Sequence, residues 1–78
     1  MNINDKYIEN LCKNIKLMRT QNNFTQQEMA KILGIGLSSL KKLEEGTVPS
    51  LLGINILFII NNIFGVAPAS IFLDPFEK

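Results

Sequence analysis

Two short stretches of helical pattern, each followed by a glycine and separated by only a few residues, restrict the fold of this chain more than any other feature. They occupy the segment from Phe24 to Gly46, FTQQEMAKILGIGLSSLKKLEEG. Glycine adopts the left-handed backbone conformation that ends a helix at little steric cost. The segment therefore predicts two consecutive helices joined by a tight turn.

The first of these helices has a complete start signal. Thr25 is a favourable N-cap residue, and Glu28 stands three positions later, where its carboxylate can accept a hydrogen bond from the Thr25 amide. We expect a helix from about Gln26 to Leu33 that ends at Gly34. Glu28 is thereby interpreted as a capping residue rather than a catalytic one.

The second helix is expected from about Leu37 to Glu44 or Glu45, with Gly46 as its stop. At about 100° per residue, the helix has a narrow apolar arc and an opposite polar arc. The apolar arc contains Leu40, Leu43 and Glu44, with Leu37 at its edge. The polar arc contains Ser38, Lys41, Lys42 and Glu45, with Ser39 on the flank.

Two helices joined by a short turn form the outline of a helix-turn-helix, a motif whose second helix can enter the major groove of DNA. A helix in that position needs an outward face of hydroxyls and ammonium groups, which donate to base edges and neutralise phosphates. The alternative is an ordinary solvated surface, as a charged helix face often is. The short turn and the two glycine stops favour the DNA-binding interpretation.

In this region the chain resembles the lambda-repressor-like, or XRE, family of helix-turn-helix regulators. The matching elements are Thr25-Gln26-Gln27-Glu28, Ala30, Leu33-Gly34-Ile35, Leu40 and Leu43-Glu44-x-Gly46, followed by Phe64-Gly65-Val66 and the segment from Pro68 to Phe72. Each short motif is weak alone, but their order and spacing together are fairly specific. The resemblance covers roughly residues 10–73. It implies a transcriptional regulator, for which we expect a repressor that binds double-stranded DNA as a homodimer.

The resemblance also implies roles for individual residues. Gln26 matches a position that commonly contacts a DNA phosphate. The positions that commonly face the bases are matched by Leu37, Ser38 and Lys42, with Ser39 and Lys41 nearby. Arg19 and Glu44 match two residues that in many relatives form an ion pair between the first helix and the second helix of the motif.

The chain departs from the family pattern at several positions. Gly36 stands where relatives usually carry Ser or Thr as the N-cap, and Glu45 would repel phosphate unless it pairs with Lys41. Leu37 replaces what is often a polar residue, so it either contacts a thymine methyl group or packs. No Arg, Asn or Gln lies on the outward face, which removes bidentate contacts to bases. We therefore expect a modest sequence preference, or one that depends on DNA shape.

The net charge of +1 hides an uneven distribution along the 78 residues. Residues 12–42 contain six positive side chains and one carboxylate, a net charge of +5, whereas residues 43–78 contain one lysine and four carboxylates, a net charge of −3. A local basic region of this kind attracts a polyanion. Further phosphate contacts are expected from Lys13, Lys16, Lys31 and Thr47. Scattered solvated lysines, with Thr47 in a plain connector, are the alternative.

The chain contains one cysteine and no histidine. An internal disulfide is impossible, zinc sites of the Cys/His type cannot form, and Ser/His or Cys/His nucleophiles are excluded. We expect Cys12 to be a buried or half-buried apolar residue, and the protein to be a non-enzyme without a metal, a cofactor or a small-molecule ligand. The polar N-terminus, MNINDKYIEN, has no secretory signal, which suggests a reducing cytoplasm.

Three further helices are expected around the motif. The first should run from about Asp5 to Gln21 and the fourth from about Ile54 to Ile63, while Pro68 suits the first turn of a fifth. The apolar face of the first helix is predicted to contain Ile8, Leu11, Ile15 and Met18. The core-facing stripe of the fourth is predicted to contain Ile54, Leu57, Phe58 and Phe64.

The fourth helix is apolar nearly all round, so it must be buried on more than one side. In a small domain, a second copy of the chain is the natural cover. The residues predicted for this dimer interface are Ile56, Ile59, Ile60, Ile63, Phe72 and Phe76. A monomer that simply buries or exposes them is the alternative.

Together these features predict one all-α, five-helix domain of the lambda-repressor-like type over residues 1–78, with the helix-turn-helix at about 25–45 and helices four and five at about 54–73. A membrane span is disfavoured because no run approaches about 18 consecutive apolar residues. Two other functions stay open. One is a protein-interaction module whose helix-turn-helix no longer contacts DNA, and the other is the antitoxin of a toxin pair.

Overall fold

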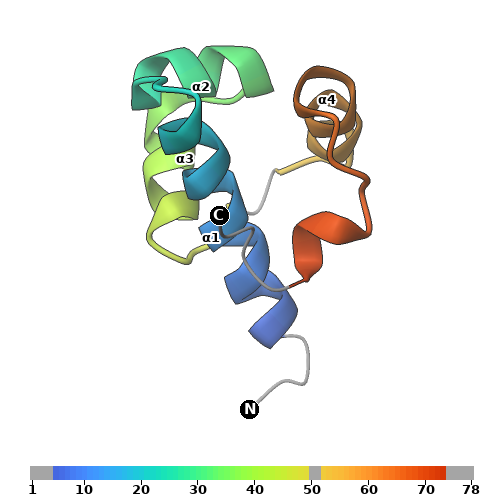
Figure 1. Ribbon diagram of the computed structural model, residues 1–78. Coiled ribbons are helices and arrows are strands. Elements are labelled where there is room, and N and C mark those ends of the chain that lie inside the picture. The colour runs from blue at the N-terminus through green and yellow to red at the C-terminus, as the bar shows by residue number, and fades with distance from the viewer. Residues whose placement is uncertain (1–4, 50–51, 74–78) are drawn as a thin grey trace.

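The computed structural model describes residues 5–49 and 52–73. In that part of the chain, four α-helices are followed by one 3-10 helix: α1 (Asp5–Gln21), α2 (Gln26–Leu33), α3 (Leu37–Glu44), α4 (Asn55–Phe64) and η1 (Ser70–Phe72) (Figure 1). The first helix, α1, packs against α3 and η1, while α2 packs against α3 and α4. The all-α class is confirmed, whereas the predicted count of five α-helices is not.

The boundaries of α2 and α3 agree with the signals in the sequence. The Glu28 N–H donates to Thr25 Oγ1 at 3.0 Å, and the Thr25 N–H donates to Glu28 Oε1 at 2.8 Å, so both bonds of the capping box are present. Gly34 and Gly46 have φ values of 73° and 101°. Both glycines thus occupy the left-handed region that ends a helix, as predicted.

Within the described residues, the segment predicted as helix five forms only the short 3-10 helix η1, and its end is bonded to side chains of α1. Asn10 Nδ2 donates to the Phe72 carbonyl at 3.1 Å. Asn14 Nδ2 donates to the carbonyls of Ile71 and Leu73 at 2.8 and 3.2 Å. The amides of α1 therefore satisfy the carbonyls that the end of a helix leaves without partners.

We expect Asn14→Ala to lower the free energy of unfolding by about 1–3 kcal/mol, since it leaves two carbonyl groups short of a donor next to the core. Thermal unfolding followed by circular dichroism would measure this, at roughly 4–8 °C in Tm per kcal/mol. Asn62→Ala is the matched control because Asn62 is exposed on α4, and its effect should stay within about 0.5 kcal/mol. Equal Tm values for the two variants would show that the asparagine does not hold η1 in place.

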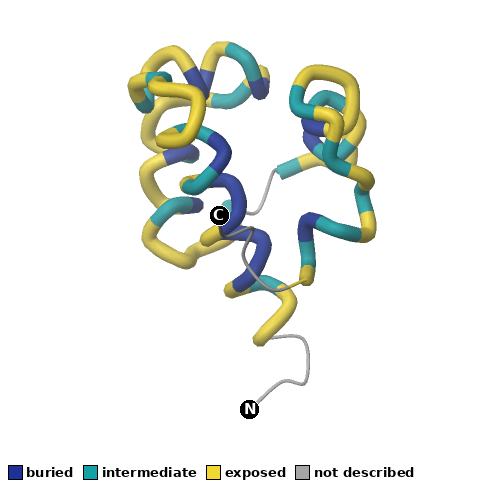
Figure 2. Tube along the Cα trace, in the orientation of Figure 1, coloured by how far each residue is buried: buried dark blue, intermediate teal, exposed yellow. Residues whose placement is uncertain are grey.

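The core lies between α1 and the other helices. Leu11, Ile15 and Met18 are buried along one face of α1, and Ile8 is half-buried beside them, as the spacing predicts (Figure 2). Cys12 is also buried, as expected. Burial raises the pKa of the Cys12 thiol, so the side chain is a neutral apolar group in this core.

The core-facing stripe predicted for α4 is correct at Leu57 and Phe64, which pack against the core, and wrong in the other two residues. Ile54 and Phe58, which were assigned to the core, are 68% and 61% exposed, whereas Ile56 and Ile60 are 4% and 1% exposed. Because α4 is apolar on nearly every side, its hydrophobic period does not distinguish one face from another. The helix α4 has 10 residues. No helix in the described part of the chain, α4 included, is long and apolar enough to cross a membrane.

This difference changes the predicted dimer interface. Ile56 and Ile60 are part of the core of the single chain, so they have no surface to offer a second copy. Ile59 and Phe72 are half-buried, Ile63 is exposed, and Phe76 lies outside the described residues. The exposed apolar surface of α4 and its approach consists instead of Ile54, Phe58 and Ile63.

Candidate nucleic-acid interface

In the turn between α2 and α3, the central residue packs against the core and the two flanking glycines are exposed. Ile35 packs against the buried core between two glycines. A Cβ atom added at Gly34 or at Gly36 would meet no other atom within 4 Å. Gly36 is the N-cap of α3 and makes no side-chain capping bond, as its lack of a side chain dictates. Among the described residues, none therefore comes within contact distance of a side chain added at these glycines.

The outward face of α3 agrees with the predicted polar arc. Leu40 and Leu43 are fully buried, and they fix the rotation of the helix about its axis. The exposed residues are Leu37, Ser38, Lys41, Lys42 and the following Glu45. Figure 2 shows the side of α3 that is turned away from α1 as largely exposed. Ser38 and Lys42 lie one helical turn apart on this face, and both are exposed in the part of the chain that the structure describes.

Three side chains hold α3 to the two helices before it. The predicted ion pair is confirmed: Arg19 Nε donates to Glu44 Oε2 at 2.6 Å, and its Nη2 donates to Glu44 Oε1 at 3.0 Å. Gln26 Nε2 donates to the same Oε1 at 3.1 Å. The remaining guanidinium nitrogen of Arg19, Nη1, donates to the Phe24 carbonyl at 3.0 Å. A bidentate pair of this geometry fixes orientation as well as distance.

These contacts bear on the roles expected for Arg19 and Gln26. Each guanidinium nitrogen of Arg19 already donates to a group of the chain, so its role is structural, as expected. Gln26 was assigned to a DNA phosphate, yet the structure gives its amide nitrogen a partner in Glu44. This bond is not evident from the sequence, because the two residues are 18 positions apart. The Glu44 side chain is 4% exposed, so its negative charge does not lie on the outward face.

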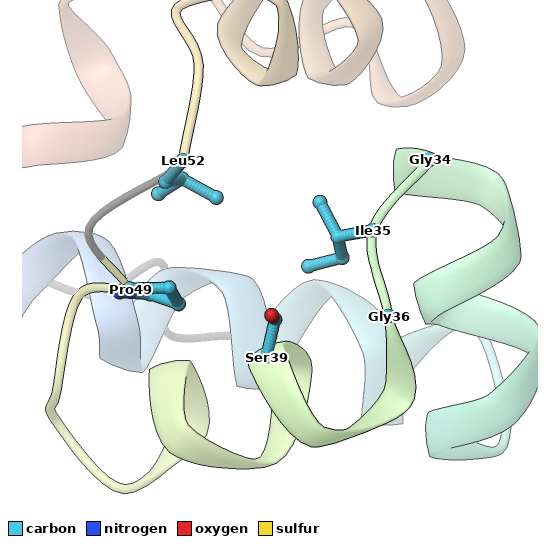
Figure 3. Close-up of a pocket in the computed structure, with 6 residues that line it drawn as sticks. All are labelled: Gly34, Ile35, Gly36, Ser39, Pro49 and Leu52. Atoms are coloured by element: carbon cyan, nitrogen blue, oxygen red, sulfur yellow. The ribbon is translucent and has the colours of Figure 1, made fainter.

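Ser39 is set apart from the other residues that were expected to face bases. It is half-buried and lines a pocket of about 210 Å³ together with Gly34, Ile35, Gly36, Pro49 and Leu52. Figure 3 shows its hydroxyl directed toward this pocket. The pocket is smaller than ordinary ligand sites, which measure about 300–1,000 Å³. The structure thus places Ser39 at the edge of the outward face rather than on it.

The other predicted phosphate contacts are exposed side chains outside α3. Lys13 and Lys16 lie on α1, Lys31 lies in the last turn of α2, and Thr47 follows Gly46 after α3. Within residues 5–49 and 52–73, the four lysines Lys13, Lys16, Lys31 and Lys42 form no salt bridge. Their ammonium groups are therefore available to a negatively charged partner.

The sequence did not reveal that the two asparagines of α1 bond to the segment at η1. Asn10 and Asn14 are buried although they are polar, and they are four positions apart on one helix. A repeated polar residue beside an apolar stripe was the available signal. Their partners lie 57 to 62 residues away along the chain, so the sequence did not reveal what they bind.

The geometry agrees with a comparison against known families. A family model described as a helix-turn-helix domain matches residues 12–73. That range contains α2, the turn and α3, and it extends through α4 and η1. No curated protein and no solved structure gives a match. The family model matches well over half of the length of the chain. The chain therefore belongs to the helix-turn-helix domain family.

Proposed function

We propose that this chain binds double-stranded DNA through α3 as a transcriptional regulator of the lambda-repressor-like, or XRE, type. It acts as a binding module in the cytoplasm and not as an enzyme. Helix-turn-helix domains place the second helix of the motif in the major groove. The observation that supports the proposal is the outward face of α3, where Ser38, Lys41 and Lys42 are exposed on a helix that is bonded to α1 and α2 through Glu44.

The arrangement of charge on the motif favours a polyanionic partner. Lys41 and Lys42 project from α3, while the Glu44 carboxylate beside them is neutralised by Arg19. Lys31 adds a positive charge at the end of α2. Each lysine that contacts a phosphate releases a condensed counterion, and this release supplies much of the binding free energy. In our proposal Lys13, Lys16, Lys31 and Thr47 contact the DNA backbone, and the residues of α3 contact the bases.

The direct test is selection of duplexes from a random library by the purified protein, followed by fluorescence anisotropy. We expect the selected duplex to bind more tightly than a random duplex at moderate salt. The logarithm of the binding constant should fall linearly with the logarithm of the salt concentration, with a slope of about −0.9 per phosphate contact. If the selected and random duplexes bind equally, the assignment to sequence-specific regulation is wrong.

A homodimer is the form in which we propose that the protein binds. Ile54, Phe58 and Ile63 are exposed, and α4 contains no charged residue, so two copies can meet there without electrostatic repulsion. A two-fold contact uses the same patch on both copies. Two motifs in one dimer would contact half-sites about 10 base pairs apart, which DNA footprinting would detect. Repression is the proposed outcome, since a dimer bound to a site that overlaps a promoter would block access to it.

We expect Phe58→Glu to convert the dimer to a monomer, because it places two carboxylates in an apolar contact. Sedimentation velocity measures the mass directly. Gln27→Glu adds the same charge on the exposed side of α2 and should leave the dimer intact. A dimer that persists in Phe58→Glu, or a wild-type protein that sediments as a monomer at all concentrations, contradicts an interface on α4.

A further inference from the structure

The first residue of α3 is a leucine without a place in the core. Leu37 is 38% exposed, whereas the other two leucines of α3, Leu40 and Leu43, are fully buried. An exposed leucine by itself is common on protein surfaces. Its position is what makes it informative, because the N-terminal residues of the second motif helix are those that contact base edges.

The polar residues around Leu37 offer little discrimination between bases. Ser38 can bond to several bases, and Lys41 and Lys42 act as point charges toward guanine or phosphate. None of them presents the paired donor and acceptor with which Asn or Gln recognises adenine, or the two parallel donors of Arg. The other group that distinguishes one base from another in the major groove is the C5-methyl group of thymine, which is recognised by apolar contact.

The surroundings of Leu37 leave it accessible to such a group. The preceding residue, Gly36, has no side chain, and a Cβ there would have open space within 4 Å. One turn further along the same face stands Lys41, whose ammonium group can contact an adjacent phosphate or guanine. The carboxylate of Glu44 is held by Arg19 and Gln26, and thus does not compete for the groove.

We infer that Leu37 is a specificity-determining residue that contacts the C5-methyl group of a thymine in each half-site. The inference rests on the proposed DNA binding and adds the chemical group that is recognised. It assigns the sequence preference of the protein to an apolar contact in place of the bidentate hydrogen bonds that its α3 lacks. Because the contact is to the methyl group, 5-methylcytosine at the same position offers the same surface.

The test uses the selected duplex and a series of copies in which one thymine at a time is replaced by uracil, which lacks only the methyl group. Burial of one methyl group corresponds to about a fourfold change in the binding constant. We expect the wild-type protein to lose about that factor at one position in each half-site. Leu37→Ala should bind the thymine and uracil duplexes equally at that position. Alanine favours the helix, and circular dichroism would verify that the variant is folded.

Two comparisons separate the outcomes. Ser38→Ala alters the next residue of the same face and should keep the uracil penalty, whatever it does to the overall affinity. A wild-type protein that binds the selected duplex but is insensitive to every uracil overturns the inference while leaving the DNA-binding proposal intact. A uracil penalty of the same size in Leu37→Ala also overturns it, because another residue then contacts the methyl group. Failure to select any duplex would overturn the proposed function itself.

Discussion

Replacing Lys41 and Lys42 together by glutamate is expected to weaken binding to the selected duplex by at least about 100-fold. Both ammonium groups are exposed on the outward face of α3. A hydrogen bond to a charged group contributes about 1.5–3 kcal/mol, so two lost contacts amount to about 3 kcal/mol or more before repulsion is counted. Fluorescence anisotropy at fixed salt measures the loss, and the salt dependence should become shallower as phosphate contacts disappear.

Two further variants distinguish a lost contact from a lost fold. Glutamate near the end of α3 opposes the helix dipole at a cost of about 0.3–1 kcal/mol for each residue. The neutral double variant, Lys41→Gln with Lys42→Gln, avoids most of this cost and should still lose more than about tenfold in affinity. Lys6→Glu, on the exposed start of α1, makes the same change in net charge as either single reversal. If it weakens binding as much as Lys42→Glu does, the interaction depends on total charge and α3 is not the contact surface.

The features that the sequence predicted correctly are determined by residues that lie close to one another in the chain. The start of α2 follows from Thr25 and Glu28, which are three residues apart, and its end follows from Gly34 alone. The outward face of α3 follows from the period of the helix once Leu40 and Leu43 are placed inside. These signals act within one or two helical turns, so no knowledge of the tertiary structure was needed to interpret them.

The features that the sequence did not predict are determined by contacts between residues that are far apart in the chain. Within the described residues, the segment predicted as helix five forms only the 3-10 helix η1, whose carbonyl groups accept hydrogen bonds from Asn10 and Asn14 of α1. Ile56 rather than Phe58 faces the core, although both are apolar residues of one helix. That choice is set by the packing of α4 against α2, and by an edge-to-face contact of Phe64 with Phe24, whose ring centroids are 6.3 Å apart. A helix with apolar residues on all sides gives no local indication of such a choice.

The pair of Arg19 and Glu44 lies between these two cases, because the family resemblance predicted the ion pair but not its bond to Gln26. The three side chains connect α1, α2 and α3 at a single carboxylate. The Glu44 side chain is 4% exposed and that of Arg19 is 15% exposed, so the charge of the carboxylate is stabilised by its hydrogen-bond partners and not by water. The position of α3 against the rest of the domain should therefore be sensitive to the loss of either charge.

We expect Arg19→Met to lower the free energy of unfolding by about 3 kcal/mol, the lower end of the range for breaking a buried pair, because Arg19 is partly exposed. A domain of this length has a total stability of about 4–12 kcal/mol, so Tm should fall by about 12–24 °C. The double variant Arg19→Met with Glu44→Met removes both charges and should recover to within about 1 kcal/mol of wild type. Chemical denaturation of the three proteins measures these differences. A double variant that is no more stable than Arg19→Met would mean that the pair stabilises the fold through packing, whereas recovery would show that the uncompensated carboxylate is what unfolds the single variant.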